Sequence, residues 1–185
     1  MKRPLSAGFT ASAALLALVA CTSDSPTAVN ELSVGAPMLS TVDGAFCTRT
    51  AGYWKTHNPS GTAAREPDAT WELIQPSAET SQFFLSGQTW VDVLGTPARG
   101  NPYYILAQQY IAAYLNRNNV NFDLPAAPPE VDAALAAAQG LFAVYTPAAI
   151  GGLTGNDPLR GQFLGLADIL GSYNEGESGP GRCPA

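Results

Sequence analysis

Apolar and aromatic residues fill positions 103–115 in the middle of the chain, interrupted by two glutamines. A helix that is apolar nearly all round belongs inside a domain. This one is shorter than the roughly 20 apolar residues that a membrane span needs. Asn101 and Pro102 precede it with residue types that favour a helix N-cap and a first helical position. We therefore predict a buried central helix against which the rest of the domain packs.

Two later segments have the pattern of amphipathic helices. In each, apolar residues recur in steps of four, three, four and three, which places them on one helical face. Pro128 and Pro129 begin the first helix, and Asp157 and Pro158 begin the second as N-cap and first residue. The apolar positions are Val131, Leu135, Ala138, Phe142 and Tyr145 in the first segment, and Leu159, Phe163, Leu166, Leu170 and Tyr173 in the second.

Residues 83–90 lack the helical pattern. Aromatic residues lie on both sides of the turn-forming pair Ser86 and Gly87. This pattern predicts a short β-hairpin. Thr89 and Asp92 have the spacing of a helix-capping pair, so a short helix is expected to follow. Together the patterns predict a mainly α fold, a small helical domain around one buried central helix with a short β-hairpin.

The first 20 residues have the pattern of a secretory signal peptide. Lys2 and Arg3 give a positive start, an apolar run covers 11–20, and residues 18–21 read Leu-Val-Ala-Cys. These four residues resemble a bacterial lipobox, and the resemblance implies that the mature chain begins at Cys21 and carries lipid there. A plain cleavable signal with an incidental cysteine is the alternative.

This interpretation divides the chain into a signal peptide at 1–20, a lipidated cysteine and flexible tether at 21–46, and a domain at 47–185. The tether is rich in small and polar residues, and a coil of this length reaches on the order of 25–30 Å. The expected location is extracytoplasmic, anchored by lipid to the bacterial cell envelope. Thr22, rather than aspartate, follows the cysteine, which favours an outer membrane where the cell has one.

Charge argues against nucleic acid as a partner. The chain has nine basic and fifteen acidic residues, and removal of the signal with Lys2 and Arg3 leaves seven basic residues and a net charge of −8. Binding to nucleic acid depends on neutralising phosphates with Lys and Arg. We therefore expect no nucleic-acid partner; the expected partners are the membrane, through the lipid anchor, and a glycan or an envelope protein.

Cys47 and Cys183 bracket the domain. Export to an oxidising compartment favours a disulfide between them, which joins the two ends of the domain. The closed loop of about 137 residues would stabilise the fold by about 5 kcal/mol in the chain-entropy model. Two free or metal-binding thiols are the alternative. His57 is the single histidine and no carboxylates stand at a recognisable ligand spacing, so neither a metal nor a cofactor is expected.

Three segments resemble a family of secreted bacterial domains, and they occupy 47–57, 106–116 and 173–183. The family opens with Cys-Thr-x-Thr-x-Gly-Tyr-Trp-Lys-x-His, contains Leu-Ala-x-Gln-x-Ile-Ala-Ala-x-Leu-Asn and closes with Tyr-Asn-x-Gly-x-x-Gly-Pro-Gly-x-Cys. The resemblance implies an extracytoplasmic, disulfide-closed module. The family has no established activity, so no catalytic residue is carried over. This chain departs from it at Arg182 and Tyr114, where relatives often have histidine and lysine.

The candidate binding residues are aromatic. Tyr53, Trp54, His57, Trp71 and Trp90 fall in the first half of the domain, and exposed rings are used to recognise sugars and proteins. In a domain of this size most such rings belong to the core. The sequence has no Gly-x-Ser-x-Gly elbow and no available cysteine nucleophile, so no catalytic residue is predicted. The expected function is a non-catalytic binding or structural module.

An extracytoplasmic hydrolase that acts on envelope polymers is the alternative. Glu66, Asp68, Glu72 and Glu79 lie close in sequence, and glycosidases work with a pair of carboxyl groups. On an acidic chain such residues are usually just solvated. An enzyme predicts a deep pocket with converging Asp, Glu or His57 side chains, whereas a binding module predicts a shallow row of exposed aromatics. A structural role predicts neither.

Overall fold

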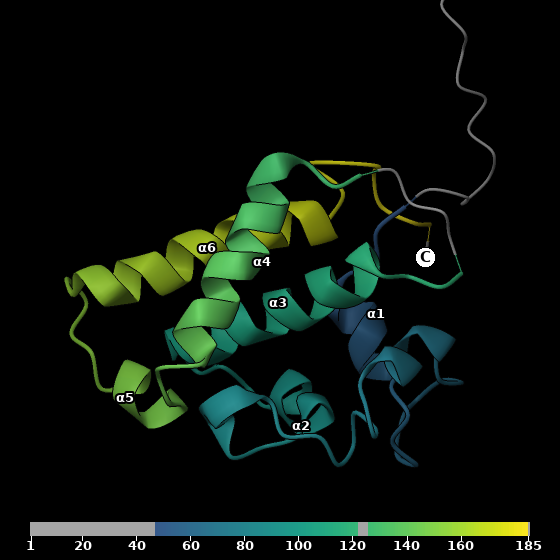
Figure 1. The fold of residues 1–185 in the computed structure, drawn as a ribbon, viewed down its shortest axis with the longest axis horizontal. Coiled ribbons are helices and arrows are strands. Elements are labelled where there is room, and N and C mark those ends of the chain that lie inside the picture. Colours follow the sequence, from purple (N-terminus) through teal and green to yellow (C-terminus); the bar gives the residue numbers. More distant parts are fainter. Residues whose placement is uncertain (1–46, 122–125, 185) are drawn as a thin grey trace, which may run out of the picture. The chain divides into compact units, whose positions relative to one another are not determined.

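The computed structural model describes residues 47–121 and 126–184 (Figure 1). This part of the chain is mainly helical, as predicted, and contains no β-strand. The signal peptide, Cys21 and the tether predicted for 1–46 lie outside the described residues. The helices are α1 (Ala51–Thr56), α2 (Trp90–Gly95), α3 (Pro102–Arg117), α4 (Pro129–Phe142), α5 (Pro147–Gly151) and α6 (Pro158–Asn174), with the 3-10 helices η1 (Ala69–Leu73) and η2 (Phe84–Ser86).

Helix α3 is the predicted central helix, and α1, α2, α4, α5 and α6 all contact it. Its first turn forms as expected, because the Asn101 side chain accepts a hydrogen bond from the backbone N–H of Tyr103 at 3.0 Å and Pro102 follows the cap. Buried positions lie on several sides of the helix. They are Pro102, Tyr103, Leu106, Ala107, Tyr110, Ile111, Ala112, Ala113, Leu115 and Asn116.

Helix α6 lies beside α3 (Figure 1) and runs in the same direction. At its start, Arg160 donates to the carbonyl of Gly100 at 3.1 Å, and at its end Asn174 bonds to Asn116. The predicted stripe faces inward at Phe163, Leu170 and Tyr173, which are buried, while Leu159 and Leu166 are half-buried. The helix therefore packs along the length of α3.

Helix α4 also presents much of its predicted stripe, since Val131, Ala138 and Phe142 are buried. Tyr145, predicted as the last position of this stripe, instead lies beyond the end of the helix, in the loop that leads to α6. That loop contains α5, a helix of five residues whose cap is the hydroxyl of Thr146, 3.3 Å from the N–H of Ala149. An amphipathic pattern cannot indicate so short an element, because it does not complete two turns.

The predicted β-hairpin at 83–90 is wrong. One isolated antiparallel bridge joins Gln82 and Thr89, and between them Phe84–Ser86 forms η2. Thr89 already serves as the N-cap of α2, where its side chain accepts from the N–H of Asp92 at 3.2 Å. The second strand of the predicted hairpin therefore cannot extend beyond the pair of Gln82 and Thr89, because the residues after Thr89 form α2.

A buried polar junction holds the N-terminal segment and α6 to the end of α3. Asn116 Oδ1 accepts from the backbone N–H of Arg49 at 2.8 Å and from Trp54 Nε1 at 3.2 Å. Asn116 Nδ2 donates to the carbonyl of Arg49 at 2.7 Å and to Asn174 Oδ1 at 3.0 Å. Asn116 is fully buried, and these four bonds use the full hydrogen-bonding capacity of its amide.

The two ends of the domain are joined next to this junction. Cys47 and Cys183 form the predicted disulfide. Around it, the N–H of Thr48 donates to the carbonyl of Gly181 at 2.8 Å, and the N–H of Cys183 donates to the carbonyl of Thr48 at 3.0 Å. Gly176 has φ +76°, and a Cβ there would overlap the backbone of Arg182, so the return of the chain requires glycine.

Replacement of Asn116 with alanine should strongly destabilise the domain. It removes the partner of two buried groups, on Trp54 and Asn174, and of the half-buried backbone of Arg49. Each buried group left unpaired costs about 1–3 kcal/mol, so we expect a loss of at least about 2 kcal/mol in the free energy of unfolding. Urea denaturation measures this loss. The control is Asn118→Ala, because Asn118 follows the last residue of α3, is exposed, and bonds through its side chain to the carbonyl of Tyr114 one turn earlier. Equal losses for the two variants would contradict the role of the junction.

Candidate functional site

The aromatic residues predicted as a ligand platform do not form one exposed surface. Trp54 is 0% exposed and Trp71 is 2% exposed, so neither ring lies open as a platform requires. Their rings meet edge to face with centroids 6.4 Å apart. These two rings are buried because large aromatic side chains bury the most apolar surface, and this burial dominates the stability of a small core.

The remaining three residues are half-buried and lie in two different settings. Trp90 packs against Phe83, with ring centroids 4.9 Å apart, and against Tyr114 at 5.5 Å. Tyr53 and His57 stack on each other instead, with centroids 3.9 Å apart. The structure therefore brings Tyr53 and His57 together at one pocket, places Trp71 in a second pocket and leaves Trp90 outside both.

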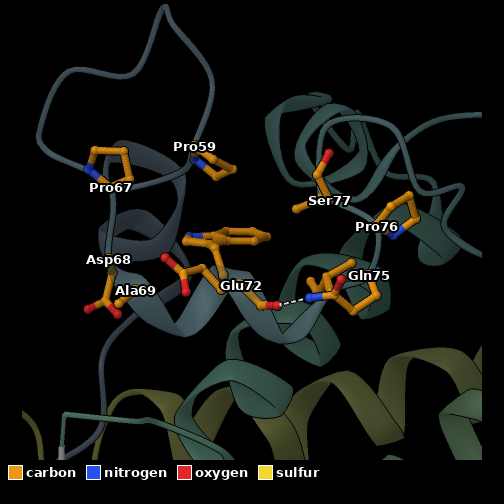
Figure 2. A pocket seen from close by; sticks show the side chains of 11 residues that line it. Pro59, Pro67, Asp68, Ala69, Glu72, Gln75, Pro76 and Ser77 are labelled. Atoms are coloured by element: carbon orange, nitrogen blue, oxygen red, sulfur yellow. Dashed lines mark hydrogen bonds between the residues drawn. The ribbon is translucent and has the colours of Figure 1, made fainter.

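The pocket around Trp71, here the tryptophan pocket, has a volume of about 390 Å³. Figure 2 shows Pro59 and Pro67 on one side of it and Gln75, Pro76 and Ser77 on the other. In this view Asp68 and Ala69 lie below Pro67, and Glu72 lies between the two sides. The lining residues are Pro59, Pro67, Asp68, Ala69, Trp71, Glu72, Ile74, Gln75, Pro76, Ser77 and Ala78.

The polar groups of the tryptophan pocket differ in what they already bind. Trp71 Nε1 is buried and has no hydrogen-bond partner among the described residues. Gln75 Nε2 donates to the carbonyl of Glu72 at 2.6 Å, which leaves the Gln75 side-chain oxygen as an acceptor. Glu72 is exposed, and no described residue bonds to its carboxylate. The pocket thus combines apolar walls with a buried donor and acceptors at its rim.

Asp68, by contrast, is fully engaged in structural bonds. Its Oδ1 accepts from the N–H of Thr70 and from Asn121 Nδ2, both at 2.9 Å, and the first of these bonds caps η1. Its Oδ2 accepts from the hydroxyl of Tyr53 at 2.9 Å. Burial raises the pKa of Tyr53, and the bond to the Asp68 carboxylate raises it further.

A second pocket, here the arginine pocket, lies at the disulfide and has a volume of about 330 Å³. Its charged lining residues are Arg49, Arg65 and Arg182, and it also contains the stacked pair Tyr53 and His57. The remaining lining residues are Thr48, Thr50, Gly52, Thr56, Cys183 and Pro184. No Asp or Glu lines this pocket.

His57 makes two local contacts through its ring. Its Nδ1 lies 2.9 Å from the carbonyl of Tyr53 and 3.1 Å from Thr56 Oγ1. Because a carbonyl can only accept, Nδ1 carries the proton, and in the neutral ring Nε2 is then an acceptor. In the part of the chain that the structure describes, no three His, Cys, Asp or Glu residues lie close enough together to hold a metal ion.

The two pockets are neighbours. Tyr53 lines the arginine pocket, and its hydroxyl reaches Asp68, which lines the tryptophan pocket. The segment between them carries Arg65 on the first pocket and Pro67 on the second. Beyond this site, none of the described helices is long and apolar enough to cross a membrane.

Sequence reasoning missed the arginine pocket. Arg49 and Arg182 each lie within two residues of a cysteine, so the predicted disulfide could have indicated that these two guanidinium groups come together. Nothing in the sequence places Arg65 beside them, because its loop position is set by tertiary bonds. One such bond joins its N–H to the carbonyl of Thr56 at 3.0 Å.

The sequence matches no family model, no curated protein and no solved structure.

Proposed function

We propose that this chain is a lipoprotein of the bacterial envelope whose domain is a non-catalytic binding module. In this proposal residues 1–20 are a signal peptide, lipid on Cys21 is the anchor, and 21–46 tether the domain on the extracytoplasmic side. The lipobox-like residues and the three motif segments support it. The disulfide is compatible with an oxidising compartment, where such bonds form and persist.

The tryptophan pocket is the observation that favours binding over a purely structural role. Its volume of about 390 Å³ falls in the range of small-ligand sites, which are mostly apolar with a few polar groups. We propose a sugar unit of an envelope glycan as the occupant. A sugar offers apolar C–H faces to the proline side chains that line the pocket, and hydroxyl donors to Glu72 and Gln75.

A hydrolase is the second candidate, because two carboxylates, Asp68 and Glu72, line this same pocket. A glycosidase needs both carboxyl groups directed at the scissile bond. Asp68 instead holds Tyr53, Thr70 and Asn121 with its two oxygens. Asp68 therefore caps η1 and links it to Tyr53 and Asn121, which supports the binding role over the catalytic one.

Filling the tryptophan pocket should abolish glycan binding. Ala69→Phe adds a ring at the pocket wall without removing core atoms, and Ala136→Phe makes the same change at an exposed site on α4. On an array of envelope glycans we expect the mature chain and Ala136→Phe to bind alike, and Ala69→Phe to bind at least about tenfold more weakly, a loss of about 1.4 kcal/mol.

Two outcomes would contradict the sugar-binding proposal. One is equal glycan binding by the Ala69→Phe and Ala136→Phe variants. The other is binding to envelope proteins, with none to glycans, in a parallel screen. Release of shortened glycan by the mature chain, lost in Glu72→Gln, would instead support the hydrolase.

The lipid anchor has its own test. Intact mass spectrometry of the protein purified from its native membrane should show a chain that begins at Cys21 with diacylglycerol attached. It should also show no free thiol, because Cys47 and Cys183 are paired. A chain cleaved elsewhere without lipid would contradict the envelope-lipoprotein proposal and would leave the domain structure unaffected.

A further inference from the structure

The arginine pocket concentrates positive charge on an acidic chain. Acidic residues outnumber basic ones by fifteen to nine in the whole sequence, yet three of the arginines line this one pocket of about 330 Å³ and no carboxylate does. We propose that the pocket is an oxyanion site that takes a phosphoryl or carboxylate group. This inference is independent of the lipid anchor and of what fills the tryptophan pocket.

The charged groups of the pocket that lack a partner are cationic donors. Among the described residues the Arg65 guanidinium has no partner, and Arg49 Nε is buried without one. The threonine hydroxyls are engaged: Thr48 Oγ1 donates to the carbonyl of Gly181 at 3.2 Å, and Thr56 Oγ1 lies 3.1 Å from the carbonyl of Gly52. Guanidinium donors match the oxygens of phosphate and carboxylate groups, often in bidentate pairs.

Arg49 is held in position before any ligand arrives. Its backbone N–H and carbonyl both bond to Asn116, and its guanidinium carbon lies 4.5 Å from the centre of the Tyr53 ring. Its Nη1 donates to the carbonyl of Pro184 at 3.2 Å. Because these contacts fix the side chain, an anion would pay less of the ordering cost that binding usually requires.

The two acidic residues that bond to side chains of the pocket oppose an anion only weakly. Glu175 pairs with Arg182 at 3.2 Å, and the two side chains are 47% and 55% exposed, so solvent screens this pair. Asp68 accepts from the Tyr53 hydroxyl and lines the neighbouring pocket. Neither contact involves Arg49 Nε or the exposed Arg65 guanidinium, which remains available to the ligand.

Titration of the mature chain with inorganic phosphate tests the proposal, with acetate as the carboxylate probe and chloride at matched ionic strength as the reference. The readout is the NMR signals of the arginine Nε–H groups together with calorimetry. We expect saturable binding of phosphate or acetate and a shift of the Arg49 signal. Arg65→Gln should weaken this binding about three- to fivefold, the upper part of the range for an exposed ion pair.

Arg65 is the residue to replace, because Arg49 also holds the junction at Asn116. The matched control is Arg99→Gln, which removes one exposed positive charge outside the pocket and should change binding less than about twofold. Ala69→Phe should leave phosphate binding unchanged, which separates this site from the tryptophan pocket. Binding of phosphate and acetate no better than chloride, or equal weakening by Arg65→Gln and Arg99→Gln, would overturn the proposal.

Discussion

The side-chain amide of Asn116 is the contact on which the rest of the domain depends. It is fully buried, and its four hydrogen bonds reach Arg49, Trp54 and Asn174, which belong to the N-terminal segment, α1 and α6. A buried polar network that is fully satisfied fixes one arrangement, whereas the loss of one member leaves costly unpaired groups. The three segments at 47–57, 106–116 and 173–183 therefore meet at a single point.

Both pockets depend on this arrangement. Arg49 lines the arginine pocket, and the Asn116 side chain bonds to both the backbone N–H and the backbone carbonyl of Arg49. One turn along, Tyr53 lines the same pocket and reaches Asp68, whose other oxygen caps η1 at the tryptophan pocket. A chain of direct contacts thus runs from the core amide to the two candidate binding surfaces, and these surfaces are rigid to the extent that the junction is.

Local patterns predicted the long helices, and with them the cap at Asn101, because periodicity and capping involve residues close in sequence. The disulfide was predictable from the cysteine count and the expected compartment. The orientation of Trp71 and the partners of Asn116 were not, since they depend on packing between residues far apart in the chain. Arg49 and Asn116, for instance, are separated by 67 positions. The candidate site was predicted least well, because it consists of such long-range neighbours.

A double-mutant cycle between Trp54→Phe and Asn116→Ala tests the central claim most directly. Trp54 Nε1 donates to Asn116 Oδ1 at 3.2 Å in a fully buried setting, so the two side chains should be energetically coupled. Once Asn116 is gone, the indole has no partner to lose, and Trp54→Phe should then cost less by about 1 kcal/mol. Unfolding free energies that simply add, within about 0.3 kcal/mol, would show that this junction does not hold the domain together.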